Sequence, residues 1–217
     1  MNAPPSFAIR GRALLPIVQG GMGVGVSAHR LAGAVAAAGA MGTIASIDLR
    51  HHHADLMAQA RGVREQETLD RFNLVALDRE IRAALELAGG RGLVAVNVMK
   101  AVDAHAAYVR QACASGAQAI VMGAGLPLDL PELAADHPEV ALIPILSDAR
   151  GVAIVLKKWA RRGRLPDAIV IEHPRYAGGH LGAPNPAQLE HARFDFAEVL
   201  PAVFALFDEM KIARDRI

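Results

Sequence analysis

The sequence predicts an α/β fold built on a parallel β-sheet, and three observations lead to this prediction. Six short apolar runs alternate with longer segments whose apolar residues recur at helical spacing. The runs are continuously apolar, as expected for strands that are covered on both faces. Hydrophobic residues make up 53% of the 217 residues, enough for a sizeable core. Strands that alternate with helices in this way form parallel sheets.

The expected elements follow one another without a linker or a low-complexity tract, so one domain over 1–217 is expected. A glycine follows most of the expected helices, which is a usual stop signal, and Ser27 is expected to cap the first one. The segments 49–67 and 172–186 are expected to be loops, the first with a short helix. The expected strands are 14–19, 41–47, 93–98, 118–122, 140–146 and 168–171. The expected helices are 28–38, 75–88, 103–115, 131–136 and 151–162, with a last one starting near Phe194.

Composition and charge narrow the class of protein. A net charge of +1 at pH 7 gives no electrostatic reason to expect nucleic acid or an anionic membrane as a partner. The single cysteine, Cys113, excludes an internal disulfide and favours a reducing compartment. The N-terminus lacks the apolar run of a signal peptide, and no apolar stretch is long enough to span a bilayer. The sequence therefore predicts a cytoplasmic protein.

No metal site is expected. The triplet His51-His52-His53 looks like a metal cluster, but adjacent residues of an extended chain point to opposite faces. We interpret the triplet as a solvated loop. Cys113 lies within a helical pattern and is expected to be a small core residue.

The most distinctive segment is the glycine-rich turn after the first apolar run, Gly20-Gly21-Met22-Gly23-Val24-Gly25. Glycines after a parallel strand let a ligand approach the backbone and expose N–H groups to it. One interpretation is a dinucleotide fingerprint, because Gly23, Gly25 and Ala28 have its spacing and Asp48 lies where a ribose-binding acid would be. A turn that binds no ligand is another interpretation.

Small or polar residues follow almost every expected strand. A doubly wound sheet would bind its ligand at one crevice, whereas a barrel gathers all strand ends into one ring. This distribution favours a (β/α)8 barrel of the TIM type, with about six of the eight βα units present. The residues concerned are Gln19, Gly20, Gly21, Met22, Asn97, Gly123, Ser147, Asp148, Glu172, Gly178, Gly179 and His180.

Simpler roles are open for several of these residues. Asn97 could bond to loop backbone, and either Ser147 or Asp148 could cap the next helix. Glu172 could be a surface carboxylate, and His180 could be a loop histidine without a catalytic role.

Taken together, these segments resemble the nitronate monooxygenase family, formerly called 2-nitropropane dioxygenases. The resemblance covers essentially the whole chain from about Leu14, and the order and spacing of its motifs also fit. The last of the motifs is the most specific. They are PIVQGGMG (16–23), VNVM (96–99), GAGLP (123–127), PDAIVIE (166–172) and AGGHLG (177–182).

The resemblance implies an FMN-dependent oxidoreductase that oxidises nitronates or nitroalkanes with molecular oxygen. It implies that His180 is the catalytic base, and a histidine suits this role because it titrates near neutrality. Asn97 would hydrogen-bond the flavin. The residues expected to bind the cofactor are Gln19, Gly20, Gly21, Met22, Asn97, Gly123, Ser147, Glu172, Gly178 and Gly179.

Two further expectations concern substrate and completeness. His173 stands where family members often have glycine, which leaves substrate preference open. The family also resembles flavin-dependent enoyl-acyl-carrier-protein reductases, so an enoyl-thioester reductase is the alternative function.

In such barrels the loops after strands seven and eight bind phosphate, yet no glycine follows Phe194. We therefore expect this polypeptide to bind FMN weakly, or to close its sheet edges through a second copy or a separate C-terminal chain. A non-catalytic, truncated flavin-binding fragment is the remaining alternative.

Overall fold

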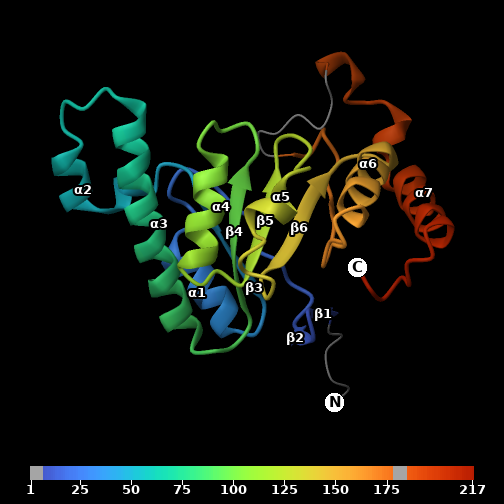
Figure 1. Ribbon diagram of the computed structural model, residues 1–217, viewed down its shortest axis with the longest axis horizontal. Helices are drawn as coiled ribbons and strands as arrows, with labels where there is room; N and C mark the ends of the chain where they lie inside the picture. Colours follow the sequence, from blue (N-terminus) through green and yellow to red (C-terminus); the bar gives the residue numbers. More distant parts are fainter. Residues whose placement is uncertain (1–6, 178–184) are drawn as a thin grey trace. The chain divides into compact units, whose positions relative to one another are not determined.

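The computed structural model describes residues 7–177 and 185–217 (Figure 1). The chain separates into two compact units. The first unit comprises the residues up to 98 together with 102–121 and 133–141. The second unit comprises 99–101, 122–132 and 142–217. Each unit is described by itself.

Five strands form a sheet in the order β3-β4-β5-β6-β7, so each strand lies beside the one before it in the chain. The pairs β3–β4 and β6–β7 are parallel, with Met41 opposite Leu93 and Ile145 opposite Val170. A dinucleotide-binding fold reverses its strand order at the ligand crevice, whereas a (β/α) barrel adds its strands in sequence. The order is therefore that of the barrel. The strands are β3 (Met41–Ala45), β4 (Leu93–Met99), β5 (Ala119–Gly123), β6 (Ala141–Leu146) and β7 (Val170–Ile171).

The first expected strand, 14–19, is shorter in the structure. Val18 makes a single parallel bridge to Met41, flanked by hydrogen bonds from Gln19 N–H to the Met41 carbonyl (2.9 Å) and from Met41 N–H to the Ile17 carbonyl (3.1 Å). The segment thus lies beside β3, where the first strand of a barrel belongs. With β3 to β7 it makes six successive strand positions, which confirms the six predicted units.

An antiparallel hairpin, β1 (Phe7–Ile9) and β2 (Arg12–Leu14), precedes this segment and was not predicted. Its two-residue turn has φ of 49° at Arg10 and 75° at Gly11. Positive φ at both central residues is typical of the turns that favour hairpins. Arginine seldom adopts such a φ, so the dipeptide carries no strong turn signal.

The helices of the first unit cover β3 and β4, and α1 packs against both β3 and α3 (Figure 1). The contact with β3 is backbone to backbone, because a Cβ on Gly42 would overlap the carbonyl of Ala32. Helix α3 begins at Gln66 instead of Val75; its polar first turns are supported by hydrogen bonds such as Gln66 to Asp70 (3.0 Å). The helices are α1 (His29–Ala37), η1 (Leu49–His52), α2 (Ala54–Gln59), α3 (Gln66–Ala88) and α4 (His105–Ala114).

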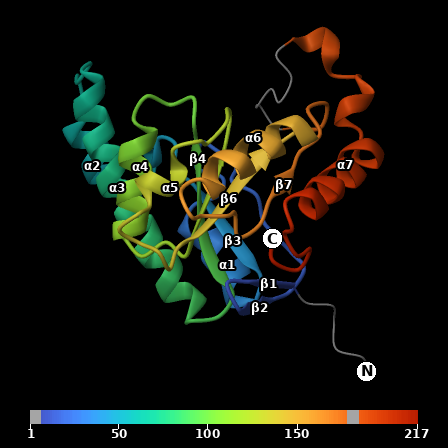
Figure 2. The same ribbon diagram turned by 45° about the vertical axis from the view of Figure 1, so that its right-hand side comes forward.

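In the second unit, α6 presents a buried face of Val152, Val155, Leu156 and Trp159, and α7 packs beside it (Figure 2). The indole N–H of Trp159 donates to the carbonyl of Pro127 at 3.0 Å, so the buried ring has its polar atom satisfied. The helices are α5 (Leu130–Leu133), at the margin of the unit, α6 (Ala149–Ala160), η2 (Pro186–Gln188), η3 (Ala192–Phe194) and α7 (Phe196–Glu209).

Across residues 7–177 and 185–217, the structure contains no helix that combines the length and the apolar character needed to cross a membrane.

The contact of Gly42 with α1 yields a first test. We expect Gly42→Ala to lower the free energy of unfolding by about 2 kcal/mol, because the added Cβ meets a backbone carbonyl that cannot rotate away. Gly20→Ala is the matched control: a Cβ there meets nothing within 4 Å, and we expect a change of less than about 0.5 kcal/mol. Urea denaturation measures both, and equal losses would contradict the packing argument.

Candidate functional site

The glycine-rich turn in the first unit is closed on itself by Ser27. The hydroxyl of this buried residue accepts the Met22 N–H at 2.7 Å, and its own N–H donates to the Met22 carbonyl at 3.0 Å. The prediction that Ser27 caps α1 is therefore wrong. Helix α1 has Ala28 at its N-cap with no side-chain cap bond, because the serine hydroxyl is committed to the turn.

Three glycines of the turn make room for side chains from β4, from the residues after β3 and from η1. A Cβ on Gly21 would overlap Asn97, one on Gly23 would overlap Ile47, and one on Gly25 would overlap His52. Gly20 differs, because a Cβ there would meet nothing within 4 Å. Protein side chains therefore explain three of the glycines, whereas the backbone of Gly20 has open space beside it.

Gln19 and Asn97 were both predicted to bind the cofactor, and their side chains are used differently. The side-chain amide of Gln19 bonds to the backbone of β3 as a neighbouring strand would. Its oxygen accepts the Thr43 N–H at 3.0 Å, and its nitrogen donates to the Thr43 carbonyl at 3.1 Å. The half-buried Asn97 amide lies against Gly21 and has no hydrogen-bond partner among the residues described. Of these two amides, only that of Asn97 is free to bond a ligand.

The outer surface of the same turn is apolar. Met22, Val24 and Val26 are 42%, 53% and 60% exposed, and Ile17 and Val18 before them are also exposed. Soluble proteins seldom leave such a cluster uncovered without a function. An apolar surface next to a free amide suits a flat ligand with hydrogen-bonding atoms at its edge.

In the second unit, the two side chains that follow β6, those of Ser147 and Asp148, have different roles. Asp148 caps α6, since its Oδ1 accepts the Gly151 N–H at 2.7 Å. Ser147, which was the other candidate cap, is half-buried, and its hydroxyl has no partner within the described ranges. The capping interpretation therefore holds for Asp148, and the Ser147 hydroxyl is available to a ligand.

The remaining predicted residues of this unit lie at the ends of β5 and β7. Gly123 ends β5; its carbonyl accepts the Lys100 N–H at 2.8 Å, and a Cβ on it would press on Ile145. Glu172 follows β7, is half-buried, and donates its N–H to the Leu146 carbonyl at 2.9 Å. A half-buried position is compatible both with a surface carboxylate and with the predicted role in cofactor binding.

Gly178, Gly179 and His180 lie outside the described residues. Just before them, His173, the residue that departs from the family pattern, links the end of β7 to the start of α7. Its Nδ1 accepts the Arg175 N–H at 3.2 Å, its Nε2 lies 3.4 Å from Asp195 Oδ1, and its ring meets Phe196 edge-on. Both ring nitrogens thus have neighbours within the protein.

Cys113 is buried in α4, as predicted for a core residue, and burial raises the pKa of its thiol to about 11. The histidine triplet is only partly the solvated loop that was predicted: His51 and His52 are exposed, but the side chain of His53 is 17% exposed and lies beside the buried Glu80. Within the described part of the chain, no group of three or more histidines, cysteines and carboxylates is placed to hold a metal ion.

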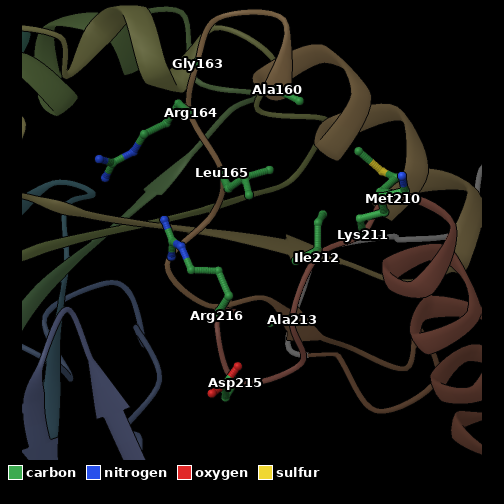
Figure 3. Close-up of a pocket in the computed structure, with 10 residues that line it drawn as sticks. All are labelled: Ala160, Gly163, Arg164, Leu165, Met210, Lys211, Ile212, Ala213, Asp215 and Arg216. Carbon is green, nitrogen blue, oxygen red and sulfur yellow. The ribbon is translucent and has the colours of Figure 1, made fainter.

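A pocket of about 600 Å³ opens in the second unit between the α6–β7 connection and the segment after α7 (Figure 3). Apolar Leu165 and Ile212 line it together with cationic Arg164, Lys211 and Arg216. None of the predicted site residues takes part. Part of its lining precedes β7 and the rest follows α7, so none of it lies at the carboxyl end of a strand, where ligands of parallel α/β proteins bind. We therefore do not assign the candidate site to this pocket.

Comparison with known proteins gives the family. The nitronate monooxygenase model matches residues 12–206, and the chain therefore belongs to this family. No curated protein matches the sequence.

One solved structure supports the fold, and two others match with lower TM-scores. The M276A mutant of FabK from Thermotoga maritima matches with a TM-score of 0.50 at 19% identity, covering 76% of this chain and 45% of FabK. Another FabK structure from that organism matches with a TM-score of 0.48 at 17% identity over 73% and 40%. Nitroalkane oxidase from Streptomyces ansochromogenes matches with a TM-score of 0.32 at 21% identity over 79% and 69%. The chain spans less than half the length of the FabK structures.

Single replacements of Ser147 and Asp148 test which of the two residues caps α6. We expect Asp148→Ala to lower the free energy of unfolding by about 1 kcal/mol, because α6 loses its N-cap. Ser147→Ala removes a hydroxyl that caps nothing and is expected to leave stability unchanged. Thermal and urea unfolding of the two variants provide the measurement, and a larger loss in Ser147→Ala would reverse our assignment of the cap.

Proposed function

We propose that the chain carries the catalytic region of an FMN-dependent oxidoreductase that oxidises nitronates or nitroalkanes with molecular oxygen. Membership of the nitronate monooxygenase family supports the activity. The observation that carries the proposal is the free Asn97 amide beside a glycine-rich turn whose outer surface is apolar.

The residues of the turn fit one edge of a flavin. Gly20 leaves its backbone open to a flat ring, and Met22 offers an apolar contact. The Asn97 amide can both donate and accept, which matches the mixed polar edge of the flavin ring. When bound, FMN would supply the electron acceptor. The roles of Gly123, Ser147, Glu172, Gly178 and Gly179 in binding it remain predictions.

His180 is proposed to take the proton from the carbon that bears the nitro group. Such a proton is acidic enough for a base that titrates near neutrality. A single FMN-binding domain over 1–217, a cytoplasmic location and a second copy or separate C-terminal chain as partner also remain predictions from the sequence.

The cofactor site is tested at Asn97. We expect Asn97→Leu to raise the dissociation constant of FMN about 3- to 10-fold, since a hydrogen bond worth about 1 kcal/mol is lost without a change in side-chain size. Quenching of flavin fluorescence on titration with protein measures it. Gln59→Leu, at an exposed position of α2, is the control. Unchanged affinity in Asn97→Leu would remove Asn97 from the site.

The reaction is tested at His180. We expect His180→Ala to lower the rate of oxygen consumption with nitroethane about 10²- to 10⁴-fold, the usual contribution of a general base. FMN affinity should stay the same, and His137→Ala, on the loop before β6, should behave as the wild type. Full activity in His180→Ala would refute the base. Oxidation of a nicotinamide that depends on an enoyl thioester, without activity on nitronates, would favour the enoyl-thioester reductase.

A further inference from the structure

We propose that His52 is a positioning residue of this site: its imidazole supports the glycine-rich turn from behind and holds it in the shape that receives the cofactor. The inference builds on the proposed flavin site and adds a residue from a different segment of the chain.

The contact between His52 and the turn is direct. His52 is the last residue of η1, and its ring lies so close to Gly25 that a Cβ there would overlap Nε2. Gly25 has φ of 76°, a conformation that glycine adopts without strain. Two glycines earlier, the side chain of Ile47 fills the equivalent space at Gly23. One segment of the chain therefore supports the turn at two points.

The segment that carries His52 is itself anchored to α3. Leu49 is fully buried, and Arg50 forms an ion pair with Asp48. The backbone N–H and the guanidinium of Arg50 both donate to the Asn73 side-chain oxygen, at 3.3 and 3.1 Å. Asn73 is buried on α3, so these bonds tie η1 to the helix that packs on α1.

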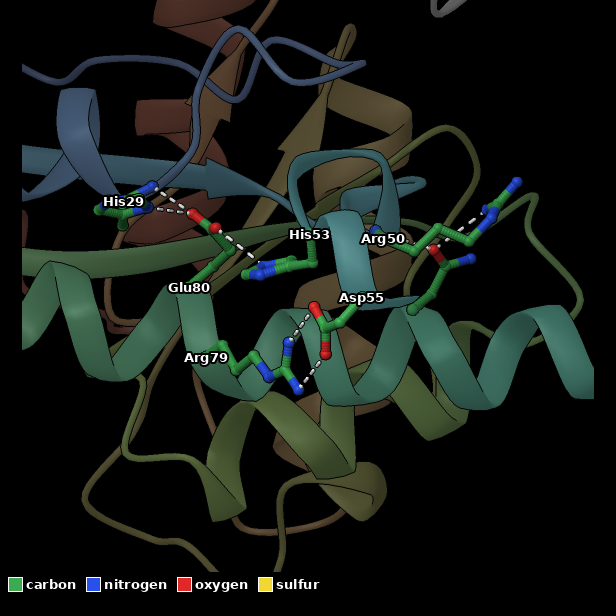
Figure 4. Close-up of polar contacts among 7 residues, drawn as sticks. His29, Arg50, His53, Asp55, Arg79 and Glu80 are labelled. Atoms are coloured by element: carbon green, nitrogen blue, oxygen red, sulfur yellow. Dashed lines mark hydrogen bonds and ion pairs between the residues drawn. The ribbon is translucent and has the colours of Figure 1, made fainter. Parts of the chain in front are cut away.

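A second anchor joins this segment to the exit of the turn (Figure 4). Glu80, only 1% exposed on α3, has one carboxylate oxygen 3.1 Å from His53 Nε2. Its other oxygen accepts the backbone N–H of His29 at 2.7 Å and lies 2.7 Å from the His29 ring. His53 follows His52, and His29 begins α1 two residues after Ser27. One buried carboxylate thus lies beside His53, the residue after the support, and accepts the backbone N–H of His29, the residue that begins α1.

The side chain of His52 acts by packing against the turn, which keeps the turn in its shape. Within the described residues, its ring has no hydrogen bond or ion pair, so its contact with the protein is packing against the turn. Met22, Val24 and Val26 of the same turn are exposed, and the flavin is proposed to bind beside them. A turn held in place before binding costs the cofactor less ordering entropy.

Hydrogen exchange of the protein without FMN tests the support directly. We expect His52→Ala to speed amide exchange at residues 22–26 about tenfold, because local opening becomes easier. His52→Phe keeps a flat ring at this position, so amide exchange at residues 22–26 should be as slow as in the wild type. His51→Ala is the matched control, because His51 is the neighbouring histidine and is exposed like His52. Wild-type exchange in His52→Ala would overturn the proposal, and Gly25→Ala should loosen the turn less in the His52→Ala background than in the wild type.

FMN affinity tests whether the support serves the site. We expect the dissociation constant to rise about tenfold in His52→Ala and to return in His52→Phe, with urea unfolding near that of the wild type. Unchanged affinity beside faster exchange would overturn the positioning role. A wild-type chain that binds no FMN would instead defeat the proposed function, and the exchange experiment would still decide whether His52 holds the turn.

Discussion

The hydrogen bonds between segment 17–19 and Met41 are the constraint on which the candidate site of the first unit depends. They are few, yet they place segment 17–19 beside the first residue of β3, so that the glycine-rich turn begins at this strand. The Gln19 amide adds two bonds to Thr43 and extends this short ladder by one residue. The turn that begins there passes Asn97 of β4, and the side chain of Asn97 lies against Gly21.

The turn illustrates how one glycine-rich sequence can serve two purposes. Gly21, Gly23 and Gly25 accept side chains from β4, from the residues after β3 and from η1, and this packing needs a backbone without Cβ atoms. The surface that remains outside is apolar and open at Gly20. A turn that is packed against side chains and still has an accessible surface is the arrangement that preorganised binding sites require.

Much of the fold was predictable from local pattern. Continuous apolar runs located β3 to β7, and glycines marked where α3 and α4 end, because buried parallel strands and left-handed helix ends each have a strong local signature. The Arg10-Gly11 hairpin and the first turns of α3 were missed. Their local sequence carries a weak signal, and the polar first turns of α3 are supported by side-chain hydrogen bonds such as Gln66 to Asp70.

The sequence by itself determined the parallel α/β class, the order of the strand ends and the family, since these depend on periodicity and on motifs read along the chain. Only the tertiary structure decided which polar groups remain for a ligand. Gln19 and Ser27 look as available as Asn97 in the sequence, but their polar atoms bond to Thr43 and Met22. The support of the turn by His52 likewise depends on residues far apart in the chain. A hydrogen-bonding group is free only when no neighbour in space satisfies it, and neighbours in space are set by packing.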